Sequence, residues 1–501
     1  MSLKDLEGLV QVGRRDLNVG VAINRLPAEV LREIFVTTCT VKLARYRHHI
    51  MTVWSPTWID KGRATSLMLV CCRWKEIALG IRELWNGIET YRKHEDHTLL
   101  ERSGRGPLKV LACGKLEPSC AVAHALQNVE HSSRIQELYW ERPLSCEDLR
   151  MPAPSLKSLA LQDDRSDSVP DGSLKLFDNH TPCLERLSLS YVQWLPSNAF
   201  AKLTFLALDH CNIPKAPIKL RNLLVGTPNL VDLILRSVPD SSYPHVQVDF
   251  EAAGMKPVML TRLRRLLIGD MWADDIDYVF RDARLNETLV SSWSLNALKQ
   301  PKQLHFQPQV AIVTGASSGL RYEVRRNMTL EDWTTFNWPQ ILPLSSVSHL
   351  CTFACKGPGL ERVRSLLRQM TTLQTLSVDI DGLTKIINTL TLFRDPIDPP
   401  LCPTLMTLRI VIPKYSDSDY DIILDSILPQ LGIKHLYLGL IDPSDGRWRG
   451  WRAVKDQLHG NFESVKFETL CCNKAYDTNL PLICVEMAHA LWSPWYLHWH
   501  Y

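Results

Sequence analysis

One spacing of apolar residues recurs along most of this chain. An apolar residue is followed by two variable positions, a second apolar residue, one variable position and a third apolar residue, as in residues 156–161. Clear copies begin at residues 135, 156, 184, 203, 230, 263, 373, 405 and 433. Because side chains alternate between the two faces of a strand, each copy predicts a short strand whose apolar anchors face a core.

The first six copies begin 21, 28, 19, 27 and 33 residues apart. These intervals bracket the length of about 20 to 29 residues that leucine-rich repeats have, in which a loop or helix returns each strand to the start of the next. Candidate return helices are residues 119–129, 360–370 and 420–428. The predicted fold class of residues 91–501 is therefore α/β, an irregular leucine-rich-repeat solenoid. The alternative interpretation is another α/β fold with leucine-rich strands.

The pattern thins between residues 270 and 345. Two short runs of alternating apolar residues, 310–313 and 320–324, flank a turn rich in glycine and serine. Alternation on both sides of such a turn is typical of a β-hairpin. We therefore expect a hairpin insertion near residues 308–326, with a surface turn from Thr314 to Gly319.

Residues 23–90 have a helical period instead, and an arm of residues 1–22 precedes them. After Pro27, which is well tolerated in the first turn of a helix, apolar residues recur three and four positions apart: Val30, Leu31, Ile34 and Phe35. A second amphipathic run covers residues 69–81, beyond an insertion at residues 37–66. Two short helices bury too little apolar surface to be stable alone. This short all-helical module therefore requires a further element or a partner.

The apolar residues of this module resemble the F-box, in the F-box-like form found in fungal proteins. The family's order is kept at Leu26-Pro27, Glu29 to Leu31, Ile34-Phe35, Val70 to Trp74, Ile77-Ala78 and Leu84-Trp85. The resemblance implies docking onto a Skp-type adaptor, which links F-box proteins to a cullin-RING ubiquitin ligase. The adaptor-binding residues that it implies are Leu26, Pro27, Ile34, Phe35, Val70 and Trp74.

The separation of the two helical blocks departs from the family's usual spacing, because Phe35 and Leu67 are 32 residues apart (67 minus 35). The path of the insertion between them is left open. The alternative is an ordinary helical hairpin whose tryptophan and phenylalanine are simply core residues.

The repeat strands also predict a site for a target protein. Residues between the apolar anchors would project from the opposite face of the sheet. An apolar patch with a charged rim usually marks a binding site. The candidate target-binding residues are the apolar Phe205, Ile234 and Leu267 with the charged rim Arg186, Asp232 and Arg265. The alternative is that a long loop, such as the hairpin at Gly315, covers the patch and makes it core.

Composition limits the possible partners. The chain has 501 residues, of which 45% are hydrophobic and 22% charged, and its formal net charge is only +3. No overall field would attract nucleic acid or an anionic membrane. The apolar runs are too short to cross a membrane, and residues 1–15 lack the apolar core of a secretory signal. We expect an intracellular protein, cytoplasmic or nuclear, with its 14 cysteines reduced.

The segment from Gly315 to Gly319 is similar to two catalytic motifs. It resembles the nucleotide-binding turn of short-chain dehydrogenases, but Arg321 stands where that family has a glycine. The family's Tyr-x-x-x-Lys pair is also absent downstream. The same residues fit the G-x-S-x-G nucleophile elbow, yet a serine nucleophile needs a positioned histidine and carboxylate. We expect no catalytic residue and no cofactor.

Two further groups of residues suggest binding chemistry only weakly. His94 and His97 lie in a polar stretch without additional ligands, so we expect no metal site. The 37–66 insertion mixes Lys and Arg with Trp54 and Trp58, a combination that can bind single-stranded nucleic acid. We favour an insertion whose tryptophans pack on the helical module.

The sequence therefore predicts a substrate-recognition subunit of a Skp-adaptor/cullin-RING ubiquitin ligase. Its helical module would bind the adaptor, and the repeat region would bind a protein substrate of unknown identity. One alternative is a non-catalytic protein-binding scaffold without ubiquitin transfer. The other is a short-chain-dehydrogenase-like enzyme built around Gly315 to Gly319.

Overall fold

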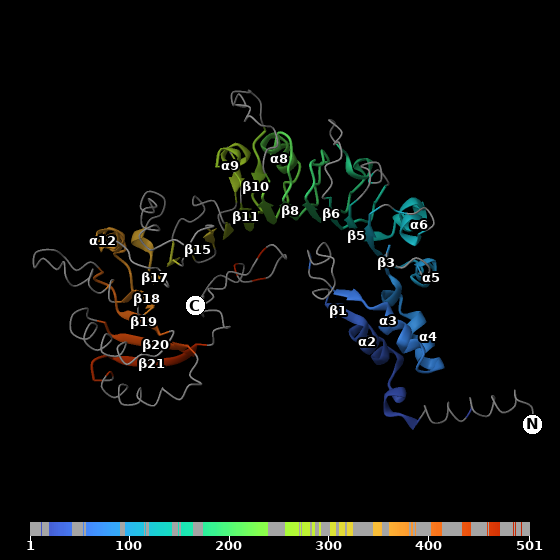
Figure 1. Cartoon of the computed structure of the whole chain (residues 1–501), viewed down its shortest axis with the longest axis horizontal. Coiled ribbons are helices and arrows are strands. Elements are labelled where there is room, and N and C mark those ends of the chain that lie inside the picture. Colours follow the sequence, from blue (N-terminus) through green and yellow to red (C-terminus); the bar gives the residue numbers. More distant parts are fainter. Residues whose placement is uncertain are drawn as a thin grey trace, which may run out of the picture. The chain divides into compact units, whose positions relative to one another are not determined.

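The structure is a computed structural model in which the chain forms two compact units (Figure 1). Unit 1 comprises Met1–Arg262, Gly269–Arg284 and Ala488–Trp492, and unit 2 comprises Leu263–Ile268, Leu285–Met487 and Ser493–Tyr501. Each unit is described by itself. The residues that the structure describes are 12, 20–42, 54, 57–90, 96–114, 116, 120–142, 149, 152–163, 174–238, 256–269, 271, 273–280, 283–285, 290–291, 301–306, 310–315, 318–323, 344–352, 360–379, 382–383, 386, 402–412, 433–441, 458, 460–470, 484, 486 and 492.

Unit 1 begins with an N-terminal module of helices and one small sheet. Its helices are η1 (Ala22–Arg25), α2 (Ala28–Cys39), α3 (Lys61–Met68), α4 (Cys72–Gly80) and η4 (Arg82–Trp85). Strands β1 (Thr40–Lys42) and β2 (Thr57–Ile59) pair antiparallel between α2 and α3. Helix α3 starts at an acidic N-cap, because the Asp60 side chain accepts a hydrogen bond from the Arg63 amide. The apolar stripes of the helices form one core that includes Leu31, Phe35, Cys39, Ala64, Trp74, Ala78 and Trp85.

A parallel sheet makes up most of the rest of unit 1. Its strands are β3 (Gly87–Glu89), β4 (Leu108–Cys113), β5 (Ile135–Glu141), β6 (Ser158–Gln162), β7 (Arg186–Ser190), β8 (Phe205–Asp209) and β9 (Asp232–Arg236). Each strand pairs in parallel with the next one along the chain. One face of the sheet buries a row of leucines in register: Leu138, Leu159, Leu187, Leu206 and Leu233.

Short helices connect several of these strands. They are α5 (Asp96–Arg102), α6 (Ala121–Gln127), α7 (Val129–Ser132), η6 (Leu176–Asn179) and α8 (Ala216–Val225), and α9 (Ala273–Phe280) lies later in the chain. A separate two-stranded sheet is formed by β10 (Met259–Leu260) and β12 (Arg284–Leu285), and β10 contacts α8. The buried Arg221 of α8 donates hydrogen bonds to the carbonyl oxygens of Tyr278 and Val279, both at 3.2 Å, and so ties α8 to α9.

Unit 2 contains the second sheet. Its strands are most of β11 (Arg265–Gly269), then β13 (Val290–Ser291), β14 (Gln303–Phe306), β15 (Val310–Thr314), β16 (Gly319–Glu323), β17 (His349–Thr352), β18 (Thr375–Asp379), β19 (Thr407–Ile412), β20 (His435–Ile441) and β21 (Ser464–Leu470). The strands β14 and β17 to β21 pair in parallel, whereas β15 pairs antiparallel with both β14 and β16.

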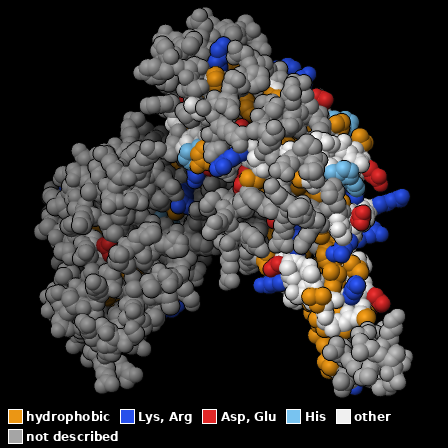
Figure 2. Space-filling model, turned by 45° about the vertical axis from the view of Figure 1, so that its right-hand side comes forward, with side chains coloured by type: hydrophobic (Ala, Val, Ile, Leu, Met, Phe, Trp, Pro, Cys, Tyr) orange, Lys and Arg blue, Asp and Glu red, His pale blue; other side chains and the backbone are white. Residues whose placement is uncertain are grey.

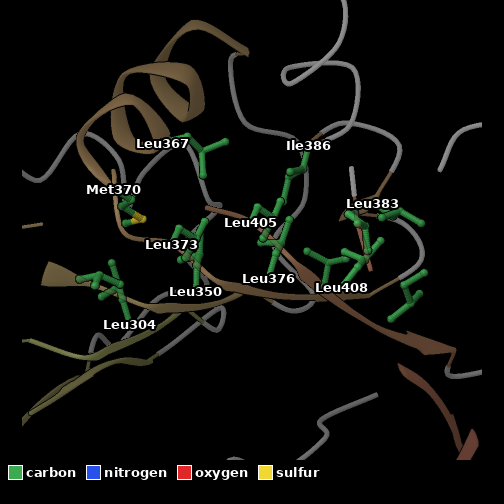
Figure 3. Close-up of a cluster of buried hydrophobic side chains, with 14 of the residues drawn as sticks. Leu304, Leu350, Leu367, Met370, Leu373, Leu376, Leu383, Ile386, Leu405 and Leu408 are labelled. Atoms are coloured by element: carbon green, nitrogen blue, oxygen red, sulfur yellow. The ribbon is translucent and has the colours of Figure 1, made fainter. Parts of the chain in front are cut away.

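The core of unit 2 lies between this sheet and α12 (Leu360–Gln369), with η7 (Leu344–Ser346) at its side. Leu367 of α12 and the neighbouring Met370 point toward leucines of the strands, among them Leu350 and Leu376 (Figure 3). All four side chains are at most 3% exposed. Burial of this apolar surface is the main stabilising contribution within the unit.

These sheets correct the predicted fold class. The chain has two large sheets, one of them fully parallel, in an α/β arrangement of the kind found in Rossmann-like folds. A short all-helical F-box-like module followed by an irregular leucine-rich-repeat solenoid was therefore the wrong architecture. The N-terminal module contains β1 and β2 and is therefore not all-helical. The periodicity was misleading because buried leucine-rich strands have the same spacing in any parallel α/β sheet.

Candidate functional site

The six predicted adaptor-binding residues do not form one surface. Phe35 is fully buried and Trp74 is 9% exposed, and their ring centroids lie 4.8 Å apart. The Trp74 indole N–H donates to the side-chain oxygen of Asn24 at 2.6 Å. These two aromatic residues hold the module together. Leu26 and Ile34 are half-buried, and only Pro27 and Val70 are exposed.

Five large apolar side chains in the described part of the module are exposed, and the F-box resemblance implied a binding role for only one of them, Val70. They are Val21 (48%), Ile23 (37%), Val30 (42%), Leu69 (81%) and Val70 (49%), and we call them the N-terminal apolar surface. Figure 2 shows hydrophobic side chains gathered on this part of the molecule. The helical spacing predicted that Val30 and Leu69 would be buried, and this was wrong. Periodicity assigns a residue to the apolar stripe of a helix, but it does not show how much of that stripe is buried.

Hydrogen bonds connect the two ends of the N-terminal apolar surface. The Arg73 guanidinium at the start of α4 donates to the carbonyl oxygens of Asn24 and Leu26, the latter at 2.6 Å. Trp74, the next residue, bonds to Asn24 as described above. The segment containing Ile23 is therefore fixed beside the segment that leads from Val70 into α4.

Two of the three apolar residues of the predicted target-binding patch are buried, and the third, Leu267, is half-buried. Phe205 is 5% exposed and Ile234 is 1% exposed. Leu267 and Arg265 belong to unit 2, where Arg265 lies 3.6 Å from a carboxylate oxygen of Glu486. The predicted hairpin at Gly315 belongs to unit 2.

Trp54, from the 37–66 insertion, covers the patch. Its ring meets that of Phe205 edge to face, with centroids 5.0 Å apart and an interplanar angle of 83°. The Arg186 guanidinium lies 5.3 Å from the centre of the Trp54 ring. Trp54 is itself only 8% exposed. The insertion tryptophan that we expected to pack on the helical module thus packs on the sheet.

Trp58 and Lys61 pack where the N-terminal module meets the parallel sheet. The Trp58 indole N–H donates to Glu89 of β3 at 2.8 Å, and the Lys61 ammonium lies 3.8 Å from the same carboxylate. Both side chains are buried. An aromatic ring and a cation that are already engaged in this way do not form a stacking platform for nucleic acid.

A polar cluster lies at the carboxyl end of β8. The Asp209 carboxylate accepts two hydrogen bonds from Arg236, at 2.7 and 3.2 Å, and lies 2.8 Å from Nδ1 of His210. The His210 ring stacks on Tyr191 at 5.1 Å. Cys211 cannot serve as a nucleophile beside them, because burial raises the pKa of its thiol to about 12. We interpret the cluster as structural, because its hydrogen bonds hold the carboxyl ends of β8 and β9 together.

The Gly315–Gly319 turn lacks the geometry of either catalytic motif. It joins the antiparallel strands β15 and β16, and the Gly315 amide donates to the Ser318 carbonyl at 2.8 Å to close it. A nucleotide-binding turn and a nucleophile elbow each lead from a strand into a helix. The turn is also less exposed than predicted, since Thr314 and Ser318 are buried, and Ser317 lies outside the described residues.

Metal and disulfide chemistry find no support in the described part of the chain. No group of three or more His, Cys, Asp or Glu side chains there could hold a metal ion. His94 lies outside the described residues. Among the described cysteines, Cys39, Cys71, Cys72, Cys120, Cys183, Cys211, Cys402 and Cys484 are free, and burial raises the pKa of Cys39 to about 11. Among the same residues, no helix is both long enough and apolar enough to cross a bilayer.

Comparisons with known proteins do not identify the chain. No protein-family model matches it. A search of curated proteins also found no match.

Proposed function

We propose that this chain is a non-catalytic binding protein that docks a Skp-type adaptor through its N-terminal apolar surface. In that role it would be the substrate-recognition subunit of a cullin-RING ubiquitin ligase. The single observation that carries the proposal is the exposure of five apolar side chains on a module whose own aromatic core is complete. Leu69, at 81% exposed, leaves nearly its whole side chain in water.

The arrangement is that of a docking surface because its two parts are fixed in advance. Arg73 and Trp74 connect them through Asn24 and Leu26. A surface that is already ordered loses little conformational entropy on binding. The resemblance to the F-box pattern, from Leu26 to Trp85, favours a Skp-type adaptor as the partner.

In this role the protein would act by holding a bound target close to a conjugating enzyme. A partner-borne conjugating enzyme would meet the lysines of a bound target at a high effective concentration. This role places the protein inside the cell, in the cytoplasm or the nucleus. The predicted patch around Phe205 is occupied by Trp54, so a target would use another surface or would compete with Trp54.

Adaptor binding by the full chain tests the proposal. Changing Leu69 and Val70 together to Glu should weaken binding to a purified Skp-type adaptor at least about 30-fold, since loss of a hot spot costs about 2 kcal/mol or more. Val129→Glu is the matched control, because Val129 is 79% exposed but lies on α7, outside the module. Equal adaptor binding by both variants and the wild type would contradict the proposal.

A scaffold without ubiquitin transfer remains the second candidate. Reconstitution with the adaptor, a cullin-RING core and a conjugating enzyme separates the two functions. A substrate receptor should increase ubiquitin transfer to itself or to a captured protein, and the Leu69→Glu, Val70→Glu variant should not. Adaptor binding without any transfer would assign the scaffold role.

A further inference from the structure

The sheet face beneath Trp54 has the composition of a binding interface. Neighbouring strands place one row of residues in register across it: Lys109, Glu137, Ser158, Arg186, Phe205 and Asp232. The next row on the same face ends in Ser188, Ala207 and Ile234, all at most 2% exposed. An apolar centre surrounded by charged residues is typical of protein interfaces. The opposite face, with its row of leucines, is the ordinary core.

Three side chains define what this face recognises. The Arg186 guanidinium lies over one face of the Trp54 ring, and Phe205 meets the ring edge to face. Arg186 is held in position by its Nε, which donates to the Ser158 hydroxyl at 2.8 Å. A cation above an aromatic face and a second ring at its edge are both favourable contacts for an aromatic group. We call Ser158, Arg186 and Phe205 the aromatic site.

The occupant of the aromatic site comes from a separate element. Trp54 belongs to the insertion, whose β2 and α3 are anchored elsewhere, at Glu89, through Trp58 and Lys61. Tryptophan and arginine are the residues most often found at the energetic centre of interfaces between proteins. The contact of Trp54 with the sheet is therefore an interface made within one chain.

We infer that the aromatic site binds a partner segment that carries an exposed tryptophan, and that Trp54 occupies this site in cis until the partner displaces it. An occupant attached to the same chain has a high effective concentration. The partner must overcome this competition, so Trp54 sets the threshold for binding. The inference does not depend on the adaptor, because it concerns a different surface of unit 1.

Removal of the cis occupant provides the test. The probe is N-acetyl-5-fluorotryptophanamide, titrated into the full chain and followed by fluorine NMR. Trp54→Gly should bind the probe at least tenfold more tightly than the wild type. Adding Arg186→Gln to Trp54→Gly should weaken this binding at least fivefold, because the cation above the ring is lost. N-acetyl-leucinamide, which has no aromatic face, should not compete for the site.

Several outcomes would overturn the inference. They are equal probe binding by Trp54→Gly and wild type, no effect of Arg186→Gln, and equal competition by the leucine derivative. A concentration-dependent dimer of Trp54→Gly would assign the site to a second copy and would also overturn it. If Trp54→Gly does not fold, Trp54→Leu replaces it, since leucine keeps apolar volume and removes the aromatic face. Adaptor binding, measured on the same variants, should be unchanged, so a failure of this inference is distinct from a failure of the proposed function.

Discussion

The indole N–H of Trp58 donates a hydrogen bond to the carboxylate of Glu89 at 2.8 Å. This bond joins β2 of the insertion to β3, the first strand of the parallel sheet. The carboxylate also attracts Lys61, whose ammonium lies 3.8 Å away in a side chain that is only 4% exposed. Glu89 therefore fixes the insertion at the point where the N-terminal module meets the sheet.

The packing of Trp58 predicts a penalty for any side chain at Gly87. A Cβ atom added there would lie 2.9 Å from Cζ2 of Trp58. We expect Gly87→Ala to destabilise the protein by about 1 to 3 kcal/mol, the usual cost of overpacking. Gly80→Ala is the matched control, because a Cβ atom at Gly80 meets no atom within 4 Å. Denaturant unfolding measures both, and equal effects of the two changes would refute the prediction.

Replacing Phe35 or Trp74 should lower the stability of the N-terminal module and should affect binding only as a consequence. Because Phe35 is fully buried and packs on Trp74, Phe35→Ala should cost about 3 to 5 kcal/mol of module stability. The exposed Thr37→Ala, on the same helix, should have little effect. Hydrogen exchange of α2 and α4 amides is the measurement. Retained protection in Phe35→Ala would show that the ring is not a core residue.

His305 should make unit 2 sensitive to acid. Its ring is 3% exposed, and burial lowers its pKa to about 3, with a smaller contribution from His349. The unfolded chain, with a pKa near 6.5, then binds more protons than the folded chain between pH 6.5 and 3. The contribution of His305 to stability is complete above pH 6.5. It falls by at most about 1.4 kcal/mol per pH unit below that.

Urea unfolding at pH 7.5 and pH 5.5 checks this dependence. The wild type should lose about 1 kcal/mol more than His305→Gln over this interval, since glutamine does not titrate. The pKa of His349 is also lowered by burial, but His349 is present in both proteins and its effect largely cancels. The same pH dependence in both proteins would exclude His305 as its source.

Replacing Arg221 by an uncharged residue should destabilise the protein. The side chain lies in α8 and is 5% exposed, and it donates to backbone carbonyls of Tyr278, Val279 and Lys256. Arg221→Met keeps much of the volume but leaves these carbonyls without their charged donor, at an expected cost of about 2 to 4 kcal/mol. The exposed Arg105→Met serves as the control. A thermal melt of Arg221→Met that matches the control would contradict this role.

Local periodicity identified individual elements well. The copies that begin at residues 184, 203 and 230 contain β7, β8 and β9, each of which starts two residues into its copy. The apolar run after Pro27 became α2. The alternating run at 310–313 lies in β15, and residues 320–323 of the second run lie in β16, which pairs antiparallel with β15. These features depend on contacts between near neighbours in sequence, and such contacts are encoded in spacing.

The sequence by itself therefore determined where several of the strands and helices form. Only the tertiary structure decided the architecture of the sheets and which surfaces remain open. Periodicity placed Phe205 on the solvent face of its strand, yet Trp54 covers it from an insertion about 150 residues earlier in the chain. It placed Leu69 in a buried stripe, yet Leu69 is exposed. The physical reason is that burial depends on which distant segment packs against a face, and no local spacing of residues encodes that packing.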